Sequence, residues 1–187
     1  MTQHNDVIRE SFTTQAQAFA ANPWVTDEER IRRLVDAARL TGSERVLDIA
    51  TGPGYIAEAF AGATREVVGV DLTDAMLAIA KQRTQEHGIS NVSFRAADAQ
   101  NLPFENGAFD VVVCRLALHH LLKPRKVLRE MARVCRARGT IIVVEDITPA
   151  NIPNARLIKT AGKCRAILRP SAHSRSASCC SSSAKPG

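Results

Sequence analysis

The sequence lacks several features that mark particular classes of protein. No apolar run approaches the roughly 18 residues that a membrane-spanning helix needs, and the first ten residues, MTQHNDVIRE, contain no apolar segment typical of a secretory signal. The five cysteines are odd in number and no two have C-x-x-C spacing, so neither a disulfide framework nor a zinc site is predicted. We therefore expect a cytoplasmic protein with reduced thiols and no bound metal.

Aromatic residues make up only 4% of the chain, which leaves few side chains that could stack on nucleic-acid bases. The net charge of +6 could indicate a nucleic-acid partner, but the position of the charge argues against one. Residues 1–150 hold 18 Lys/Arg and 19 Asp/Glu, whereas residues 151–187 hold seven Lys/Arg and no acid. The excess positive charge belongs to the tail, so we do not expect the folded part to bind nucleic acid.

From residue 27 onward the chain alternates between short apolar runs and amphipathic segments. Runs rich in β-branched residues predict strands, and segments with apolar residues at helical spacing predict helices. The predicted strands are 45–50, 66–71, 91–98, a run that begins at 109, and 140–146, and the predicted helices are 27–40, 55–63, 73–88 and 124–139. This alternation is the pattern of βαβ units, so the predicted fold class is α/β, with a parallel sheet flanked by helices.

The character of the sequence changes after Pro149. We predict one domain over residues 1–150, with N-terminal helices in residues 1–40, followed by a basic, serine-rich tail over residues 151–187. One short basic helix could form within residues 154–169. The last segment, SAHSRSASCCSSSAKPG, contains seven serines and little apolar surface to offset its ordering entropy, so we predict that it is disordered.

A glycine turn joins the first predicted strand to a helix in VLDIATGPGYIAEAF, residues 46–60. Residues 52–57 satisfy the G-x-G-x-x-A form of the dinucleotide fingerprint. Asp71 ends the next strand, 19 residues after Gly52, where a carboxylate can bind both ribose hydroxyls. These features fit NAD as well as S-adenosyl-L-methionine (SAM). Asp48, an acid inside the strand end, favours a ligand that carries an ammonium or sulfonium charge.

Three further stretches follow in order along the chain: VVGVDLTDAML, AADAQNLPFENGAFDVVVCRLALHHL and RARGTIIVVEDITP. With VLDIATGPG, they make residues 12–150 resemble the class I SAM-dependent methyltransferases, in the branch that includes the ubiquinone/menaquinone-biosynthesis C-methyltransferases (methyltransferase type 11). The resemblance implies a Rossmann-like sheet and SAM as the cofactor. It also implies that RESFTTQAQAFAANPW forms a lid helix, with Phe19 where relatives often have tyrosine.

The resemblance implies a role for each residue of the SAM site. The backbone from Asp48 to Gly54 would line the methionine part, with Asp48 facing its amino group. The ribose hydroxyls would bind Asp71, and the adenine edge would meet Asp98. The complete set of implied cofactor-binding residues is Asp48, Ala50, Thr51, Gly52, Gly54, Asp71, Leu72, Asp98, Ala99 and Arg115.

Other roles remain open for some of these positions. Ala50 stands where many methyltransferases have glycine, a departure that is common in this branch. Asp98 could simply form a turn, Leu72 could be ordinary core, and Arg115 could contribute its backbone alone.

Two adjacent histidines, His119 and His120, follow the fourth predicted strand. They should therefore lie at the carboxyl edge of the sheet, where ligands bind in open α/β folds. One of them could act as a general base for a hydroxyl or carbon-acid acceptor, and only one should face the cleft. Asp146, at the end of the fifth strand, could orient that imidazole, and related methyltransferases have an acid there. Packing at a helix entry is the alternative role for both histidines.

The leading functional prediction is methyl transfer from SAM to a small-molecule acceptor, at carbon, oxygen or nitrogen. A SAM-binding remnant or interaction protein without turnover is the second reading. The third, an NAD-dependent oxidoreductase, rests only on the glycine turn.

The resemblance also exposes a missing part. Class I methyltransferases usually have seven strands in the order 3-2-1-4-5-7-6, the last two forming an antiparallel hairpin, whereas this sequence predicts five. The acid-free stretch from residue 154 stands where that hairpin should be. We interpret the change as a frameshift near residues 151–160 or a truncated gene product. The edge of strand 140–146 is then expected to be unpaired, and self-association through it becomes possible.

Overall fold

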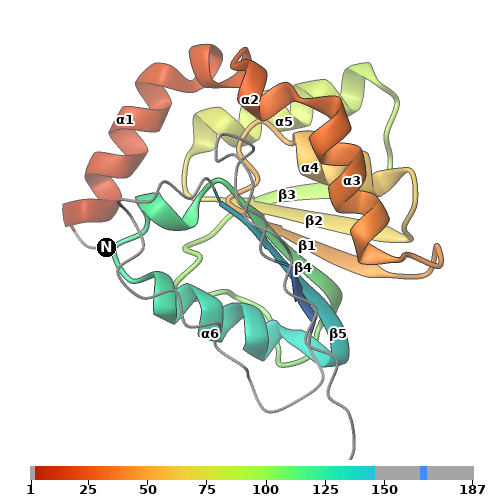
Figure 1. The fold of residues 1–187 in the computed structure, drawn as a ribbon. Helices are drawn as coiled ribbons and strands as arrows, with labels where there is room; N and C mark the ends of the chain where they lie inside the picture. The colour runs from red at the N-terminus through yellow and green to blue at the C-terminus, as the bar shows by residue number, and fades with distance from the viewer. Residues whose placement is uncertain (1–2, 146–164, 168–187) are drawn as a thin grey trace, which may run out of the picture.

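The computed structural model describes residues 3–145 and 165–167 of the chain (Figure 1). The helices are α1 (Gln3–Ala20), α2 (Pro23–Thr26), α3 (Glu28–Ala38), α4 (Tyr55–Ala61), α5 (Asp74–Glu86) and α6 (Pro124–Val134), with a short 3₁₀ turn, η1, at Leu118–His120. The strands are β1 (Arg45–Ile49), β2 (Glu66–Asp71), β3 (Val92–Ala96), β4 (Phe109–Arg115), β5 (Cys135–Val144) and β6 (Arg165–Ile167).

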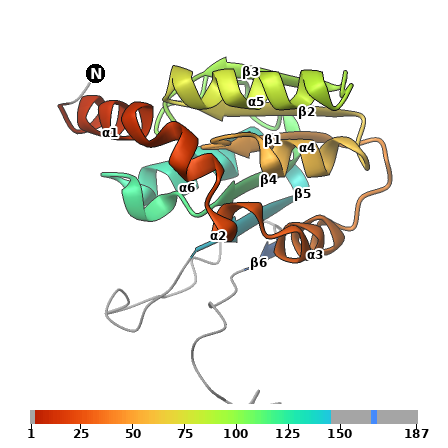
Figure 2. The same cartoon turned by 90° about the horizontal axis from the view of Figure 1, so that it is seen from above.

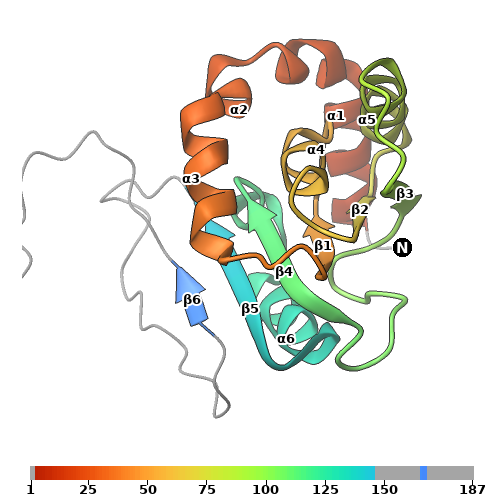
Figure 3. The same cartoon turned by 90° about the vertical axis from the view of Figure 1, so that its right-hand side faces the viewer.

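The described strands form one sheet in the order β3-β2-β1-β4-β5-β6, and every neighbouring pair is parallel. Helices cover both faces of this sheet. α3 and α4 pack on one face through Ile31, Ile56 and Phe60, and α5 lies on the same side (Figures 1 and 3). α6 packs on the opposite face through Val127 and Met131. The predicted α/β fold with a parallel sheet flanked by helices is confirmed.

Strand order places a ligand site between β1 and β4. The chain moves outward from β1 through β2 to β3 and then returns to β4 on the other side of β1. In open α/β sheets such a reversal leaves a crevice at the carboxyl ends of the strands, and ligands bind there.

The N-terminal helices lie over this crevice. Figures 1 and 2 show α1 and α2 running across the carboxyl ends of the central strands. The end of α1 is tied to the start of α4, because the Tyr55 hydroxyl donates a hydrogen bond to the Ala20 carbonyl oxygen at 2.9 Å. No helix in the described part of the chain is both long enough and apolar enough to cross a bilayer.

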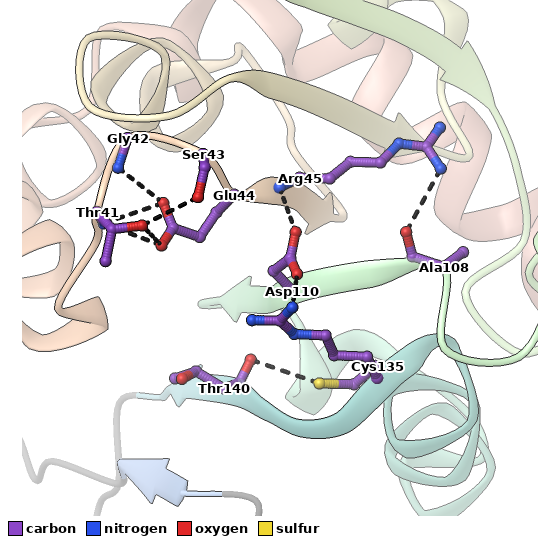
Figure 4. Close-up of polar contacts among 10 residues, drawn as sticks. Thr41, Gly42, Ser43, Glu44, Arg45, Ala108, Asp110, Cys135 and Thr140 are labelled. Carbon is purple, nitrogen blue, oxygen red and sulfur yellow. Dashed lines mark hydrogen bonds and ion pairs between the residues drawn. The ribbon is translucent and has the colours of Figure 1, made fainter.

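The helix predicted over residues 124–139 ends at Val134 instead, and β5 begins at the next residue. The pairing of β4 with β5 is irregular there: Phe109 pairs with Cys135, but Val111 pairs with Thr140. Figure 4 shows how the bulge is held, with the Cys135 thiol donating to the Thr140 carbonyl oxygen at 3.8 Å. The helical spacing of apolar residues in the sequence does not show where the helix ends. Pairing of β5 with the distant strand β4 outweighs the local helix propensity of residues 135–139.

A second correction concerns the outer edge of β5. β6 pairs in parallel with it, from Thr140 opposite Arg165 to Ile142 opposite Ile167. The expectation that this edge is unpaired is therefore wrong over these residues, as is the suggestion of a helix at 165–167. The proposed frameshift region and the predicted disorder over 171–187 lie outside the described residues.

Candidate functional site

A cavity with an empty volume of about 1000 Å³, part of it open to solvent, lies at the carboxyl ends of the strands beneath α1. Nine of the ten residues predicted to bind the cofactor line it: Asp48, Ala50, Thr51, Gly52, Asp71, Leu72, Asp98, Ala99 and Arg115. The fold thus brings residues from the ends of four strands to one cavity.

Gly54 is the predicted residue that does not line the cavity. It precedes α4 with a φ of 86°, and a Cβ atom there would lie 2.8 Å from the Ala80 Cβ and 3.3 Å from the Phe94 ring. A glycine is therefore required by the close approach of the turn to α5 and β3. The motif identified the position, but its geometry gives it a packing role.

The turn after β1 needs left-handed backbone at two positions. Gly52 has a φ of 53°, and so does Ala50. For alanine, this conformation costs about 1–2 kcal/mol. A glycine at the position of Ala50 would avoid this strain. A hydrogen bond from the Thr51 amide to the Val70 carbonyl oxygen, at 2.9 Å, helps to hold the turn against β2.

Asp48 is buried directly beneath this turn, with 1% of its surface exposed. The Thr51 hydroxyl donates to its Oδ2 at 2.5 Å. Burial raises the pKa of Asp48 from 3.8 to about 7, with a further upward contribution from Asp71. It outweighs the hydrogen bonds from Thr51 and the Ala57 amide and the attraction of Arg115. The negative charge of Asp48 is thus poorly compensated in the free protein.

Asp71, at the end of β2, is fixed at the cavity wall by backbone amides. The Gly52 amide donates to Oδ2 and the Thr73 amide donates to Oδ1, each at 2.9 Å. Burial raises the pKa of Asp71, and these hydrogen bonds oppose the rise. The carboxylate therefore joins the glycine turn to the start of α5.

α1 closes the cavity by contacts with two predicted site positions. The Asn5 side chain, itself buried, donates to Asp98 Oδ2 at 3.0 Å, and Arg9 Nε donates to the Leu72 carbonyl oxygen at 3.3 Å. The Gln100 amide holds the other oxygen of Asp98 at 2.8 Å. Asp98 is therefore more than a turn-former, because it also anchors α1.

Arg115 holds α2, the second of the two helices that lie over the cavity. Its guanidinium donates from Nη1 to the Val25 carbonyl oxygen at 2.9 Å and from Nη2 to the Trp24 carbonyl oxygen at 2.6 Å. The side chain thus satisfies carbonyl groups of α2 while it lines the cavity. It has a structural role that the sequence could not specify.

Of the two histidines, only His120 lines the cavity. Its ring meets Phe12 of α1 edge-on, with centroids 5.1 Å apart, and lies 3.9 Å from the His119 ring. Burial lowers the pKa of His120, and the neighbouring His119 lowers it further against the attraction of Glu145. Burial and His119 therefore favour the neutral form of the His120 imidazole.

His119 instead meets an acid that the sequence interpretation missed. Its Nδ1 lies 2.6 Å from Oε2 of Glu145, the residue that follows β5. The predicted partner, Asp146, lies outside the described residues. Glu145 and Asp146 are adjacent in VVED. Side chains alternate between the two faces of a sheet only within a strand, and these residues lie at its end. The sequence therefore does not indicate which of the two acids faces the histidine. Among the described residues, no group of three or more His, Cys, Asp or Glu is arranged to hold a metal ion.

The family model described as "Methyltransferase domain" (Methyltransf_11) matches residues 47–143. The "Uncharacterized methyltransferase YcgJ" of Bacillus subtilis (strain 168) is 35% identical over 138 residues, which cover 74% of this chain and 54% of that protein. The chain belongs to the SAM-dependent methyltransferase family.

Another relative in this methyltransferase family is the "Ubiquinone/menaquinone biosynthesis C-methyltransferase UbiE" of Ectopseudomonas mendocina (strain ymp). It is 36% identical over 133 residues, which cover 69% of this chain and 52% of the relative. The chain spans about half the length of the curated relatives it matches. Its cofactor, as for the family, is SAM.

Solved methyltransferase structures share the fold. The crystal structure of YcgJ from Bacillus subtilis superposes with a TM-score of 0.64 at 36% identity, over 66% of this chain and 53% of that one. A phosphoethanolamine N-methyltransferase of Haemonchus contortus, solved with S-adenosylhomocysteine, reaches a TM-score of 0.67 at 22% identity, over 76% of this chain and 35% of that one. At that identity the likeness shows the fold alone.

Proposed function

We propose that this chain binds SAM in the cavity beneath α1 and transfers a methyl group to a small-molecule acceptor. The observation that carries the proposal is the buried, poorly compensated carboxylate of Asp48 under the glycine turn. A cationic ligand group beside it would restore the ionised form. NAD would instead bring an anionic pyrophosphate to the same turn, next to this acid, so its binding is disfavoured.

Each wall of the cavity suits one part of SAM. The turn from Asp48 to Gly52 fits the amino-acid end, and Asp71 fits the ribose hydroxyls. Asp98 and Ala99 fit the adenine edge, with Leu72 against its face. When bound, SAM supplies a methyl group that its sulfonium charge makes reactive. The task of the protein is then to hold the acceptor at near-attack distance and to exclude water.

His120 is proposed as the proton acceptor of the site. Its neutral imidazole can take a proton from a hydroxyl or an acidic carbon of the acceptor at its unprotonated nitrogen. His119 points to Glu145 instead and is not proposed to contact the acceptor. A role for Asp146 stays a prediction, as does the cytoplasmic location.

The walls near His120 indicate an apolar acceptor. Ile8, Phe12, Phe19 and Leu121 line the cavity, and Phe12 contacts the His120 ring. Apolar side chains favour planar or aliphatic groups over charged ones. Relatives named for ubiquinone and menaquinone biosynthesis and for demethylmenaquinone methylation support the ring carbon of a quinol as one candidate. Phenol oxygens and amines are the other classes to test.

A SAM-binding protein without methyl turnover is the second candidate. The chain spans only about half the length of its curated relatives, so the match by itself does not carry their whole activity to this chain. A related structure at 30% identity, with a TM-score of 0.58 over 64% of this chain and 46% of that one, is named "[4+2]-Cyclase SpnF". The fold therefore does not by itself fix the reaction.

Transfer of a tritiated methyl group from SAM to quinols, phenols and amines tests the proposal. We expect product with at least one class and a fall in kcat of about 100-fold or more in His120→Ala, because a general base contributes roughly that much. His87→Ala, at a half-exposed histidine paired with Glu58, is the matched control and should leave kcat unchanged. SAM binding without product from any class would favour the second candidate, and full turnover in His120→Ala would remove His120 from the mechanism.

A further inference from the structure

The backbone that follows β4 converges on the end of β5. Leu116 has a φ of 54°, a strained conformation for a side chain that is not glycine, and its amide donates to the Val144 carbonyl oxygen at 2.7 Å. The next two amides, of Ala117 and Leu118, donate to a single oxygen, Glu145 Oε1, at 2.9 and 2.7 Å. Three consecutive N–H groups are thus turned toward one strand end, a concave arrangement suited to an anion.

The second oxygen of Glu145 meets the histidine pair. His119 Nδ1 lies 2.6 Å from Oε2, so the carboxylate contacts two amides and one imidazole at once. The His119 ring in turn lies 3.9 Å from the His120 ring, and Phe12 packs on His120 edge-on. The Glu145 side chain is 13% exposed and does not line the cavity, so any effect on an acceptor must pass through these neighbours.

We propose that Glu145 is a positioning residue: it clamps the segment from Leu116 to His120 so that the His120 imidazole stays at the cavity wall between His119 and Phe12. The inference rests on the proposed function for its catalytic meaning, but the clamp itself is a property of the free protein. The charge-assisted hydrogen bonds hold the strained turn at Leu116, which places η1 and the histidine it carries.

The surroundings of His120 show why position matters for its protonation. Glu145 and His119 act on it from its own side, while Asp48, Asp71, Asp98 and Arg115 line the same cavity from the sheet. α1 contributes the apolar Phe12 and the neutral Asn5. The imidazole is buried against the cavity wall although the residue as a whole is exposed, and this burial lowers the pKa of His120 more than the attraction of Glu145 raises it. Moving the ring away from the wall by releasing the clamp should therefore raise that pKa, even though the attraction of Glu145 is lost.

Nuclear magnetic resonance on histidine- and amide-labelled protein measures the clamp without any acceptor. In Glu145→Ala we expect the His120 pKa to rise, the Ala117 and Leu118 amides to lose protection from exchange, and SAM affinity to stay within about threefold. In turnover assays, kcat should fall about tenfold or more. Glu145→Gln keeps one acceptor oxygen, so both amides should stay protected but shift upfield, since hydrogen bonds to a neutral group are weaker.

Glu130→Ala is the matched control, because Glu130 also accepts a hydrogen bond from a loop amide, that of Leu102 at 2.8 Å, but lies away from the histidines. It should leave the His120 titration unchanged. If neither Glu145 variant changes the His120 titration or the amide shifts, the proposed clamp is wrong. If Glu145→Ala does not fold, the amide shifts of Ala117 and Leu118 in Glu145→Gln decide the question alone. If no acceptor is methylated but the His120 titration moves as expected, the clamp stands and the proposed methyl transfer fails.

Discussion

At the scale of single residues, Asp48 lowers the stability of the free protein but can favour the binding of a cationic ligand. A carboxylate with 1% of its surface exposed and a pKa of about 7 destabilises the fold when it ionises. The Thr51 hydroxyl offsets only part of that cost. A cationic ligand would supply the missing compensation, so stability and ligand binding should respond to Asp48 in opposite directions.

Substitution of Asp48→Asn tests this opposition. The amide oxygen can still accept from Thr51, and no charge is buried, so we expect the free protein to gain roughly 1–3 kcal/mol in free energy of unfolding at pH 8. SAM affinity should fall roughly 10- to 100-fold, since a hydrogen bond to a charged group contributes about 1.5–3 kcal/mol. Urea unfolding and calorimetric titration measure the two effects. A less stable variant with unchanged SAM affinity would contradict both halves.

The same residue predicts a pH dependence. Between pH 4 and pH 7 Asp48 is ionised in the unfolded chain but holds a proton in the fold, so folding takes up a proton and this contribution to stability declines as the pH rises. The advantage of Asp48→Asn over the unsubstituted protein should therefore grow from pH 4 to pH 7 and level off above it. Unfolding curves at several pH values check this, and an advantage that shrinks over the same range would refute it.

Local motifs located most of the cavity wall but not its acid–histidine contact. The glycine turn, Asp71 and Asp98 follow strand ends at fixed spacing, and a parallel sheet brings such ends together, so they could be placed from the sequence. The choice of Glu145 as the partner of His119 depends on how the backbone turns after β4, with Leu116 at positive φ. No composition or spacing encodes that turn.

At the scale of elements, the junction of α6 and β5 shows where sequence periodicity fails. Val134 and Cys135 are both buried, one as the last residue of the helix and the other as the first of the strand. The chain then passes through a bulge in which Arg136 pairs with Asp110 at 2.7 Å. The Arg45 amide donates to the other Asp110 carboxylate oxygen (Figure 4). These are contacts with distant segments, which a local pattern does not contain.

Gly139, within this bulge, should be intolerant of any side chain. A Cβ atom there would lie 2.6 Å from the Cys135 sulfur and 2.7 Å from the Asp110 carbonyl oxygen, the latter a backbone atom that cannot rotate away. We expect Gly139→Ala to lower the free energy of unfolding by roughly 1–3 kcal/mol, as overpacking does. Denaturant unfolding measures the loss.

Gly62→Ala provides the control for that substitution. Its φ is −66° and nothing lies within 4 Å of the added Cβ, so alanine should be neutral or stabilise the fold by roughly 0.4–1 kcal/mol. Equal effects of the two substitutions would mean that the bulge is not as tightly packed as described.

At the scale of the whole molecule, the basic and acidic residues within residues 1–150 are distributed unevenly along the chain, although their numbers nearly balance. Residues 122–138, which include α6 and the bulge, hold seven Lys/Arg and one Glu, whereas the rest of residues 1–150 holds 11 Lys/Arg and 18 Asp/Glu. All seven basic residues except Arg133 are exposed. The basic charge is thus not confined to the tail.

The cover formed by α1 and α2 is the other property of the whole molecule that matters for function. It is tied to the sheet at Asp98, at Leu72 and through Arg115, three points spread around the cavity. A ligand that fills the cavity would be enclosed between these ties and the glycine turn. Binding should therefore stabilise the complete fold, because the ligand contacts both parts at once.

Calorimetric titration of the full chain with SAM and, separately, with NAD shows directly whether this cavity binds SAM. We predict that one SAM binds per chain at pH 8, that NAD gives no heat, and that Asp71→Asn weakens SAM binding at least about tenfold. Binding of NAD but not SAM, or SAM affinity that does not change in Asp71→Asn, would show that this cavity is not a SAM site.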